Sequence, residues 1–417
     1  MKQILFIGTA ALILSAPAIA LANPADMFGM GADARGLGNA MTGRPSGAMA
    51  AYYNPAFLGF LGGAELSAGW LGADMSLKLS GDDYDSQQTG GVELGAATPL
   101  GGKLRWFSLG LAAYLPLGAA ARLYTQAPDT PQFVLYRALN RFAVYPALAV
   151  KIGDYFALGL GCHILASASG WINFQIDLAN QSAPGRDFLF DMKPAFAPTA
   201  GLAFAYRDII SGGISYRGEI DMPISFPANF DLGIISLLVQ GQGLQWYTPH
   251  ELSVGASWRP IPPLSVQFDA TWALWSGAPD QSTQVTIQPS VLLPEVKNPP
   301  VEPGFSDIII PRLGIEYRPL PDLPLRVGYL YYPTPVPSQV YQTNLIDADR
   351  HIITMGAGYR FKDPLEVIPQ GISVDGFFQY HLIASRSVVK KSVVDDVGDY
   401  GISGRLIVGG LALTLHL

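Results

Sequence analysis

Residues 263–276 read PLSVQFDATWALWS, and this stretch decides the fold because its apolar and polar residues alternate. Successive residues of a β-strand point to opposite faces, so a strand built from it has one apolar face. That face carries Leu264, Val266, Phe268, Ala270, Trp272 and Leu274. The other face carries Ser265, Gln267, Asp269 and Thr271. An apolar exterior and a polar interior are typical of strands in a membrane barrel.

Similar segments follow one another along most of the chain. Backbone groups inside a bilayer must be hydrogen-bonded internally, so a membrane protein built from strands has to close into a barrel. The sequence therefore predicts an all-β fold, a transmembrane antiparallel β-barrel of about 14 strands. We expect these strands at 65–79, 90–98, 105–115, 140–151, 155–178, 194–206, 209–225, 248–258, 263–276, 308–319, 324–333, 349–361, 372–385 and 401–417.

The predicted connections alternate between short turns and long loops. The long loops cover roughly 116–139, 179–193, 226–247, 277–307, 334–348 and 386–400. Outer-membrane barrels have an even strand number, short periplasmic turns and longer external loops. Fourteen strands would place both termini in the periplasm and every long loop outside. A soluble β-sandwich would need several domains with linkers, and a propeller would need a repeat of about 40–50 residues; neither is visible.

Composition agrees with this class. Charged residues make up only 14% of the chain, against about 25% in soluble domains. Residues 1–22 read as a secretory signal peptide, with Lys2, an apolar run over 4–14 and a small-residue cleavage site at 20–22. The alternative is a membrane anchor, but the apolar run is short and is followed by Ser15 and Pro17. The expected location is the cell outer membrane of a Gram-negative bacterium, and the net charge of −7 argues against nucleic acid as a partner.

A glycine- and alanine-rich segment precedes the first strand. Residues 29–40 read GMGADARGLGNA and lead to Asn54-Pro55-Ala56. Small residues allow a segment to pack inside a narrow lumen, so we expect residues 23–63 to form a hatch that plugs the barrel formed by residues 64–417. Pro55 favours an extended Asn54, whose side chain can hydrogen-bond to the barrel wall. The alternative is an ordered entry turn into the first strand.

With these features in place, the chain resembles the FadL family of outer-membrane transporters for long-chain fatty acids and other hydrophobic compounds. Residues 36–40 (GLGNA) followed by Asn54-Pro55-Ala56 resemble its hatch and its Asn-Pro-Ala motif. Residues 252–258, 266–275, 311–318, 325–329, 332–337, 347–351 and 356–359 resemble its later strands and the connections between them. The chain departs from barrels of this kind at its end, LALTLHL, which has no terminal aromatic residue.

The resemblance implies a lateral exit for the ligand. In that family a kink in the third strand opens a gap that the Asn-Pro-Ala motif contacts. The third strand here is expected at 105–115, so the gating candidates are Asn54, Pro55, Ala56, Gly110, Pro116 and Gly118. Proline interrupts a strand ladder and glycine often marks a bulge. Alternatively, Pro116 simply ends the strand.

Two of the predicted external loops are unusually apolar. Residues 129–139 have the start signal of a helix, a capping residue followed by Pro131, and residues 230–239 fit an amphipathic helix. The resemblance implies a hydrophobic capture groove between such loops. Its candidate residues are Phe133, Leu135, Leu139, Ile234, Ile235, Leu237 and Leu238. Arg137 or Arg141 would contact a ligand carboxylate, because arginine offers a bidentate fork. The alternative is that these loops only cover the barrel.

Charged residues at inward positions carry both signs, which predicts ion pairs that brace the lumen around the hatch. They are Arg217, Glu219, Asp221, Asp269, Arg312, Glu316, Arg318, Arg326, Arg360 and Asp375. The five histidines show no metal-ligand spacing, and there is no GxSxG nucleophile motif. Asp375 and His381 share a strand face but would lie about 20 Å apart, too far for a dyad. We therefore expect no enzymatic activity, no metal and no cofactor.

The predicted function is passive uptake of hydrophobic small molecules, either long-chain fatty acids or aromatic hydrocarbons. Capture would occur at the external loops and exit would be lateral, near the hatch. Expected partners are the ligand, the lipids of the outer membrane and, during biogenesis, the barrel-assembly machinery; the protein is expected to be a monomer. One alternative is a non-transporting barrel that acts as an assembly or surface-attachment partner. Another is an open, water-filled porin.

Overall fold

The structure is a computed structural model. It describes residues 27–84, 89–117, 132–133, 142–166, 168–178, 181–192, 194–231, 236–279, 284–289, 296–297, 304–340, 344–391 and 398–417. The signal peptide predicted over residues 1–22 lies outside the described residues.

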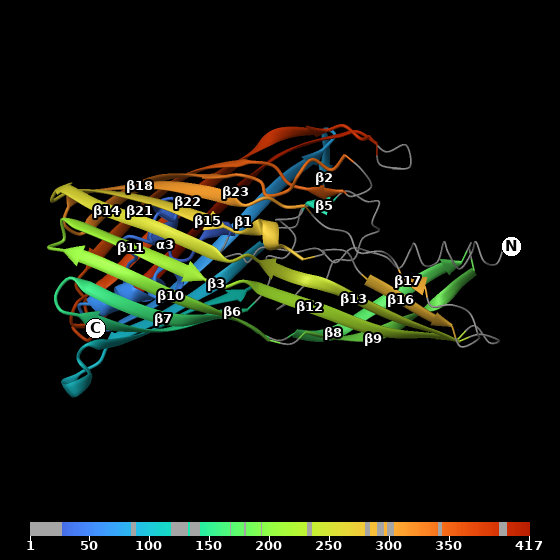
Figure 1. The fold of residues 1–417 in the computed structure, drawn as a ribbon. Coiled ribbons are helices and arrows are strands. Elements are labelled where there is room, and N and C mark those ends of the chain that lie inside the picture. Colours follow the sequence, from blue (N-terminus) through green and yellow to red (C-terminus); the bar gives the residue numbers. More distant parts are fainter. Residues whose placement is uncertain are drawn as a thin grey trace.

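Fourteen strands of the described chain form one closed antiparallel barrel (Figure 1). In order around the wall they are β1 (Glu65–Leu79), β3 (Thr89–Pro99), β4 (Phe107–Pro116), β6 (Ala143–Ile152), β7 (Phe156–Leu165), β10 (Ala195–Tyr206), β11 (Ile210–Arg217), β14 (Glu251–Ile261), β15 (Leu264–Ala273), β18 (Ile308–Leu320), β19 (Leu323–Tyr332), β21 (Arg350–Phe361), β22 (Ile372–Val388) and β23 (Tyr400–His416). The barrel closes at β1, where Trp70 is opposite Leu411 of β23 and Val92 of β3. A short strand, β2 (Asp82–Tyr84), pairs antiparallel with the end of β1 and adds no position to the wall. The prediction of a 14-stranded barrel is confirmed.

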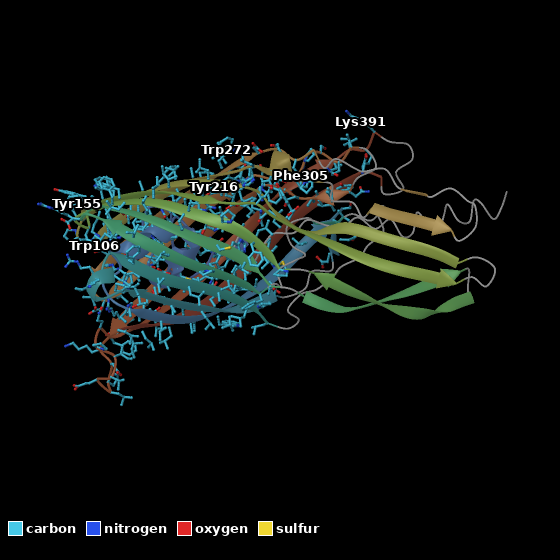
Figure 2. All side chains as sticks on the ribbon, turned by 60° about the horizontal axis from the view of Figure 1, so that its bottom comes forward. Trp106, Tyr155, Tyr216, Trp272, Phe305 and Lys391 are labelled. Carbon is cyan, nitrogen blue, oxygen red and sulfur yellow. The ribbon has the colours of Figure 1, made fainter. Side chains whose placement is uncertain are left out.

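The alternation in β15 produces the predicted two faces. Phe268 and Trp272 are exposed on the outside of the barrel, whereas Gln267, Asp269 and Thr271 are buried inside it. Exposed aromatic residues also lie near both ends of the wall. Figure 2 shows Trp106 and Tyr155 near one end, with Tyr216 and Trp272 nearer the other. Such bands mark the two interfaces of a membrane.

The two ends of the barrel differ. At one end, which we call the short-turn end, the strands are joined by tight turns and the C-terminus is located (Figure 1). At the opposite, long-loop end, a second sheet projects beyond the barrel. Its strands are β8 (Ala168–Leu178), β9 (Gln181–Met192), β12 (Ile220–Asp231), β13 (Ser236–Thr248), β16 (Gln284–Pro289) and β17 (Val296–Lys297).

This second sheet corrects several expectations. The strands predicted at 155–178 and 209–225 are each two strands, one in the barrel and one in the second sheet. Residues 181–192 and most of 226–247, predicted as loops, are strands of the second sheet. The helix predicted over 230–239 is wrong, because Phe230 and Asp231 end β12 and residues 236–239 begin β13. The two strands pair as a hairpin, with Phe230 opposite Leu237. Cross-strand hydrogen bonding therefore overrides the local apolar pattern.

A segment after β19 folds inward at the long-loop end. Val336, Gln339, Asn344, Ile346, Asp347 and Ala348 are all buried. We call residues 333–340 and 344–349 the cap. Its short strand β20 (Leu345–Ile346) pairs in parallel with β5 (Gln132–Phe133). The predicted helix over 129–139 is therefore wrong at residues 132 and 133, and its other residues lie outside the described part of the chain.

The N-terminal segment lies inside the barrel. It contains α3 (Ala32–Gly36), η1 (Gly47–Met49), α4 (Ala50–Tyr53) and η2 (Pro55–Phe60), and these elements contact the inner face of the wall. We use the word hatch for residues 27–63. No helix among the described residues is long and apolar enough to cross a membrane.

Candidate functional site

The most constrained residue of the hatch is Asn54, which is fully buried between α4 and η2. Its backbone is extended (φ −157°, ψ 100°), as predicted for a residue that precedes a proline. The side-chain Oδ1 accepts a hydrogen bond from Ala56 N at 3.1 Å. The Nδ2 donates to the carbonyl oxygens of Thr42 and of Leu202 in β10, each at 3.1 Å. The predicted hydrogen bond between Asn54 and the barrel wall is therefore confirmed.

The wall carries glycines where this motif touches it. A Cβ at Gly159 of β7 would collide with Pro55 and Ala56. A Cβ at Gly201 of β10 would collide with the Asn54 side chain. Gly213 of β11 also lacks room for a side chain, because the Asn54 Nδ2 lies beside it. Backbone therefore packs directly on backbone, and the wall beside the motif is only one main chain thick.

The third barrel strand, β4, lies beside the next part of the hatch. A Cβ at Gly110 would be 2.7 Å from both Cδ atoms of Leu58 in η2. The ladders from β4 to β3 and to β6 run through Gly110 with no shift of register. The structure thus shows no bulge at Gly110, and Pro116 is the last residue of β4. Gly118 lies outside the described residues.

A second fixed point joins the hatch to β3. Arg35 of α3 and Glu93 are both buried and form a bidentate ion pair, in which Arg35 Nη1 donates to Glu93 Oε2 at 2.9 Å. Arg35 Nη2 also donates to Gly29 O at 2.6 Å, and Gly31 N donates to Glu93 Oε2 at 3.1 Å. The guanidinium lies 4.9 Å from the centre of the Phe377 ring. Breaking this pair would leave a buried charge, so it holds α3 in one position.

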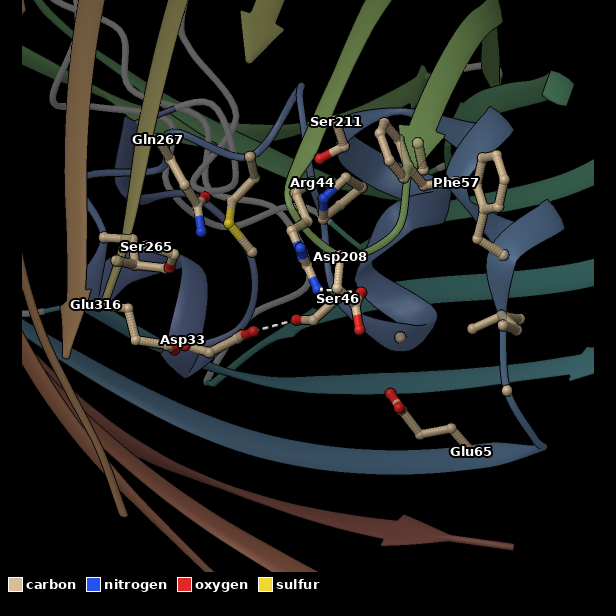
Figure 3. A pocket seen from close by; sticks show the side chains of 18 of the residues that line it. Asp33, Arg44, Ser46, Phe57, Glu65, Asp208, Ser211, Ser265, Gln267 and Glu316 are labelled. Carbon is tan, nitrogen blue, oxygen red and sulfur yellow. Dashed lines mark hydrogen bonds and ion pairs between the residues drawn. The ribbon is translucent and has the colours of Figure 1, made fainter. Parts of the chain in front are cut away.

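A polar cavity of about 650 Å³ lies between the hatch and the short-turn end (Figure 3). Asp33 and Ser46 of the hatch are hydrogen-bonded to each other across it. Arg44 reaches Asp208, in the turn between β10 and β11, with an Nη2–Oδ1 distance of 3.0 Å. An apolar molecule moving straight through the lumen would therefore enter polar surroundings after passing the hatch.

Ion pairs brace the lumen, as the mixture of inward-facing signs predicts. Arg326 pairs with Glu316, with an Nε–Oε2 distance of 2.8 Å, and with Asp375. Arg217 pairs with Glu251 at 3.4 Å. Three residues on the predicted list lie at exposed positions instead. Glu219 is half exposed near His250, Asp221 is exposed, and Arg360 is exposed and donates to Gln370 O.

The hatch also binds to the wall through Asp269 of β15, which accepts a hydrogen bond from Thr42 N at 2.6 Å. Among the described residues, no group of three or more His, Cys, Asp or Glu is arranged to hold a metal ion.

The predicted capture residues fall largely outside the structure. Leu135, Arg137, Leu139, Arg141, Ile234 and Ile235 lie outside the described residues. Phe133 belongs to β5, which pairs with the cap, and Leu237 and Leu238 belong to β13 of the second sheet. The structure therefore leaves the capture groove a prediction.

Some residues of the site escaped the sequence analysis. Gly159, Gly201 and Gly213 come from three neighbouring strands, and only their register brings them to one place. The signal present in the sequence was glycine at inward-facing positions of strands that are otherwise rich in leucine and alanine. The ion pair between Arg35 and Glu93 was not predicted either, because no local pattern joins a helix of the hatch to β3.

Comparisons with known proteins agree with this geometry. A family model described as outer membrane protein transport protein (OMPP1/FadL/TodX) matches residues 18–399. No curated protein matches the chain.

Several solved structures share the fold. A Pseudomonas aeruginosa FadL homologue has a TM-score of 0.64 at 17% identity, and the match covers 96% of this chain and 100% of that one. The P. putida toluene transporter TodX has a TM-score of 0.60 at 15% identity, with coverages of 94% and 99%. The CymD monoaromatic hydrocarbon channel has a TM-score of 0.58 at 16% identity, with coverages of 93% and 97%.

Proposed function

The chain belongs to the OMPP1/FadL/TodX family of outer membrane transport proteins, and on that premise we propose that it takes up small hydrophobic molecules by passive diffusion. The ligand is captured at the long-loop end, descends the lumen to the hatch and leaves sideways into the membrane. The short-turn end and both termini face the periplasm. The observation that carries the proposal is the contact of Asn54-Pro55-Ala56 with a wall of bare glycine backbone.

The surroundings of the hatch support a sideways exit. Below the hatch lies the cavity with Asp33, Arg44 and Asp208, where an apolar molecule would have to pass charged groups as well as apolar residues such as Phe57 and Phe60. Beyond the wall lies lipid, where each buried methylene contributes about 0.8 kcal/mol. The free energy of a hydrocarbon therefore falls when it passes through the wall into lipid and rises when it enters the cavity. No energy source and no cofactor are needed, because the gradient and this preference suffice.

Two ligand classes fit the proposal, aromatic hydrocarbons and long-chain fatty acids. The toluene transporter and the monoaromatic hydrocarbon channel among the structural neighbours favour the first class. A fatty acid would need a basic partner for its carboxylate, for which Arg137 and Arg141 are the candidates. Lipids of the outer membrane surround the barrel, the barrel-assembly machinery inserts it, and it works as a monomer.

Uptake by cells and native mass spectrometry test this function together. Expression in the outer membrane of a Gram-negative host should raise the uptake of radiolabelled toluene or oleate several-fold over cells that carry an empty vector. The protein extracted in mild detergent should carry a bound lipid or hydrocarbon. No added uptake, with a stoichiometric protein partner and an empty lumen, would instead identify an attachment barrel. Steady ion conductance in planar bilayers would identify a porin.

A further inference from the structure

The turn between β21 and β22 carries the two most exposed large apolar side chains of the described residues. Leu365 is 81% and Val367 is 71% exposed, whereas Leu160, on the lipid-facing wall, is 66% exposed. The turn comprises residues 362–371 and follows the last pair of the ladder, Phe361↔Ile372, at the short-turn end. Apolar side chains that stand this far out mark a contact with another apolar surface.

Hydrogen bonds hold the turn in a shape that keeps these side chains outside. The Asp363 carboxylate accepts hydrogen bonds from Leu365 N at 3.0 Å and from Val367 N at 2.8 Å. It also accepts one from Ile368 N at 2.8 Å. Glu366, between the two apolar residues, has a φ of 53°, a left-handed conformation that strains a residue with a side chain. The backbone therefore keeps Leu365 and Val367 exposed at a cost in strain.

The apolar exterior of the barrel leads up to this turn. Tyr359 of β21 is exposed on the outer face of the wall, opposite the exposed Val374 of β22. The rings of Tyr359 and Phe361 are stacked with their centres 6.1 Å apart. In Figure 2 the turn is the orange segment that extends sideways from the barrel at the lower left, at the end that carries Trp106 and Tyr155. The barrel axis runs across the membrane, so a sideways turn lies along the membrane and not toward the aqueous phase.

A second turn at the same end has a similar make-up. Leu104 and Trp106, between β3 and β4, are 54% and 42% exposed, and the Arg105 guanidinium lies 4.9 Å from the centre of the Trp106 ring. This turn is the cyan segment that projects from the lower left of the barrel in Figure 1. Lys103 here and Lys362 in the first turn are exposed. Tryptophan and basic residues together are typical of a membrane interface, where the rings enter lipid and the cations meet phosphates.

We propose that the turn between β21 and β22 is a membrane anchor, in which Leu365 and Val367 enter the lipid leaflet at the short-turn end and Lys362 contacts lipid phosphates. The turn between β3 and β4 anchors a second side of the barrel through Leu104 and Trp106. The partner is a phospholipid surface, because both turns extend sideways from an exterior that already faces lipid. The anchors fix the depth of the barrel in the membrane, whatever molecule it transports.

Spin labels on single cysteines test the anchor in the whole barrel. Cys162 is the only cysteine of the chain, so Cys162→Ala provides the background for Leu365→Cys and Val367→Cys. The labelled barrels are placed in nanodiscs of phosphatidylcholine and phosphatidylglycerol. Oxygen concentrates in lipid, whereas a charged nickel chelate stays in water. Both labels should be several-fold more accessible to oxygen than to nickel. The matched control is Asp322→Cys, in the exposed turn between β18 and β19, whose label should prefer nickel.

The other outcomes contradict the anchor in different ways. Labels at 365 and 367 that respond to nickel as the label at 322 does would place the turn in water. Labels that neither reagent reaches would show that protein, a second copy or a periplasmic partner, covers the turn. Lys362→Glu should reduce the oxygen preference at 367 when phosphatidylglycerol is present, and an unchanged preference would remove Lys362 from the anchor. None of these measurements involves transport, so failure of the anchor leaves the proposed uptake untouched.

Discussion

At the scale of single residues, the hatch is held to the wall by polar groups that hydrogen-bond to it. The Asn54 side chain accepts one hydrogen bond and donates two, and those with Ala56 N and Thr42 O are buried while that with Leu202 O is partly buried. A buried polar group that loses its partner costs about 1–3 kcal/mol. The Asn54 side chain therefore stabilises the docked hatch mainly by giving Thr42 O, Leu202 O and Ala56 N a hydrogen-bond partner. The motif therefore binds the hatch by hydrogen bonds to a part of the wall where the residues are glycines.

Replacing Asn54 should loosen the hatch without unfolding the barrel. Asn54→Ala leaves the Ala56 N–H and two carbonyl oxygens without this partner, which should destabilise the docked hatch by about 2–4 kcal/mol. Hydrogen exchange of the Ala56 and Phe57 amides should accelerate accordingly, while the barrel keeps its heat-resistant electrophoretic mobility. Ser46→Ala, at an exposed hatch position, serves as the control and should change exchange at these amides little. Equal exchange in both variants would show that the Asn54 hydrogen bonds do not hold the hatch.

Only part of this site could be predicted from the sequence. Pro55 restricts Asn54 locally, so the extended backbone followed from two adjacent residues. The contacts with Gly159, Gly201 and Gly213 depend on the register of three strands, which no local pattern specifies.

At the scale of elements, the alternation of apolar and polar residues predicted the strands of the barrel wall well and those of the second sheet poorly. β15 and β22 were predicted correctly because lipid outside and polar lumen inside impose opposite demands on alternate residues. Residues 155–178 carry only a weak turn signal at Ala166-Ser167, so β7 and β8 were predicted as one strand. Residues 230–239 fit a helix by local pattern, yet β12 and β13 form a hairpin there. Pairing between strands decided these cases, and it leaves little trace in the local sequence pattern.

The cap is the element whose stability should depend on pH. Asp347 is buried in it, and this burial raises the pKa of its carboxyl group to about 6. Arg350 opposes the shift by favouring the charged carboxylate. Because the folded pKa lies above the ordinary value, the protonated cap is the more stable form, and this stability is lost as pH rises through about 6. A shift of about two pKa units corresponds to about 3 kcal/mol.

Hydrogen exchange measured across that range tests the cap. The amides of residues 344–349 should be better protected near pH 5 than near pH 8, after correction for the intrinsic rate. Asp347→Asn removes the titrating group and should make protection independent of pH in this window. Protection that rises with pH in the native protein would mean that Asp347 is stabilised as a carboxylate, contrary to the effect of its burial.

At the scale of the whole molecule, the lumen is closed in two places. The hatch fills its middle, fixed by Asn54 to β10, by Arg35 to β3 and by Thr42 to Asp269 of β15. The cap closes the long-loop end, where Arg386 Nη1 donates to Asp347 O at 2.8 Å. We expect the hatch to exclude most water and ions, because it contacts strands on several sides of the wall. On the proposed route, a ligand that enters from the long-loop end passes the cap before it meets the hatch.

Deleting each closure in turn should show which one seals the pore. Removing residues 27–60 leaves a lumen lined by Arg326, Glu316, Asp375 and Asp269, groups that water can solvate, so steady ion conductance in planar bilayers should appear. Replacing residues 334–346 with a short glycine-serine linker opens only the long-loop end, and the intact hatch should keep the barrel silent. Both variants must keep the heat-resistant mobility of a closed barrel. A silent hatch deletion beside a conducting cap deletion would reverse the assignment and make the cap the seal, because the charged lumen conducts as soon as its actual barrier is gone.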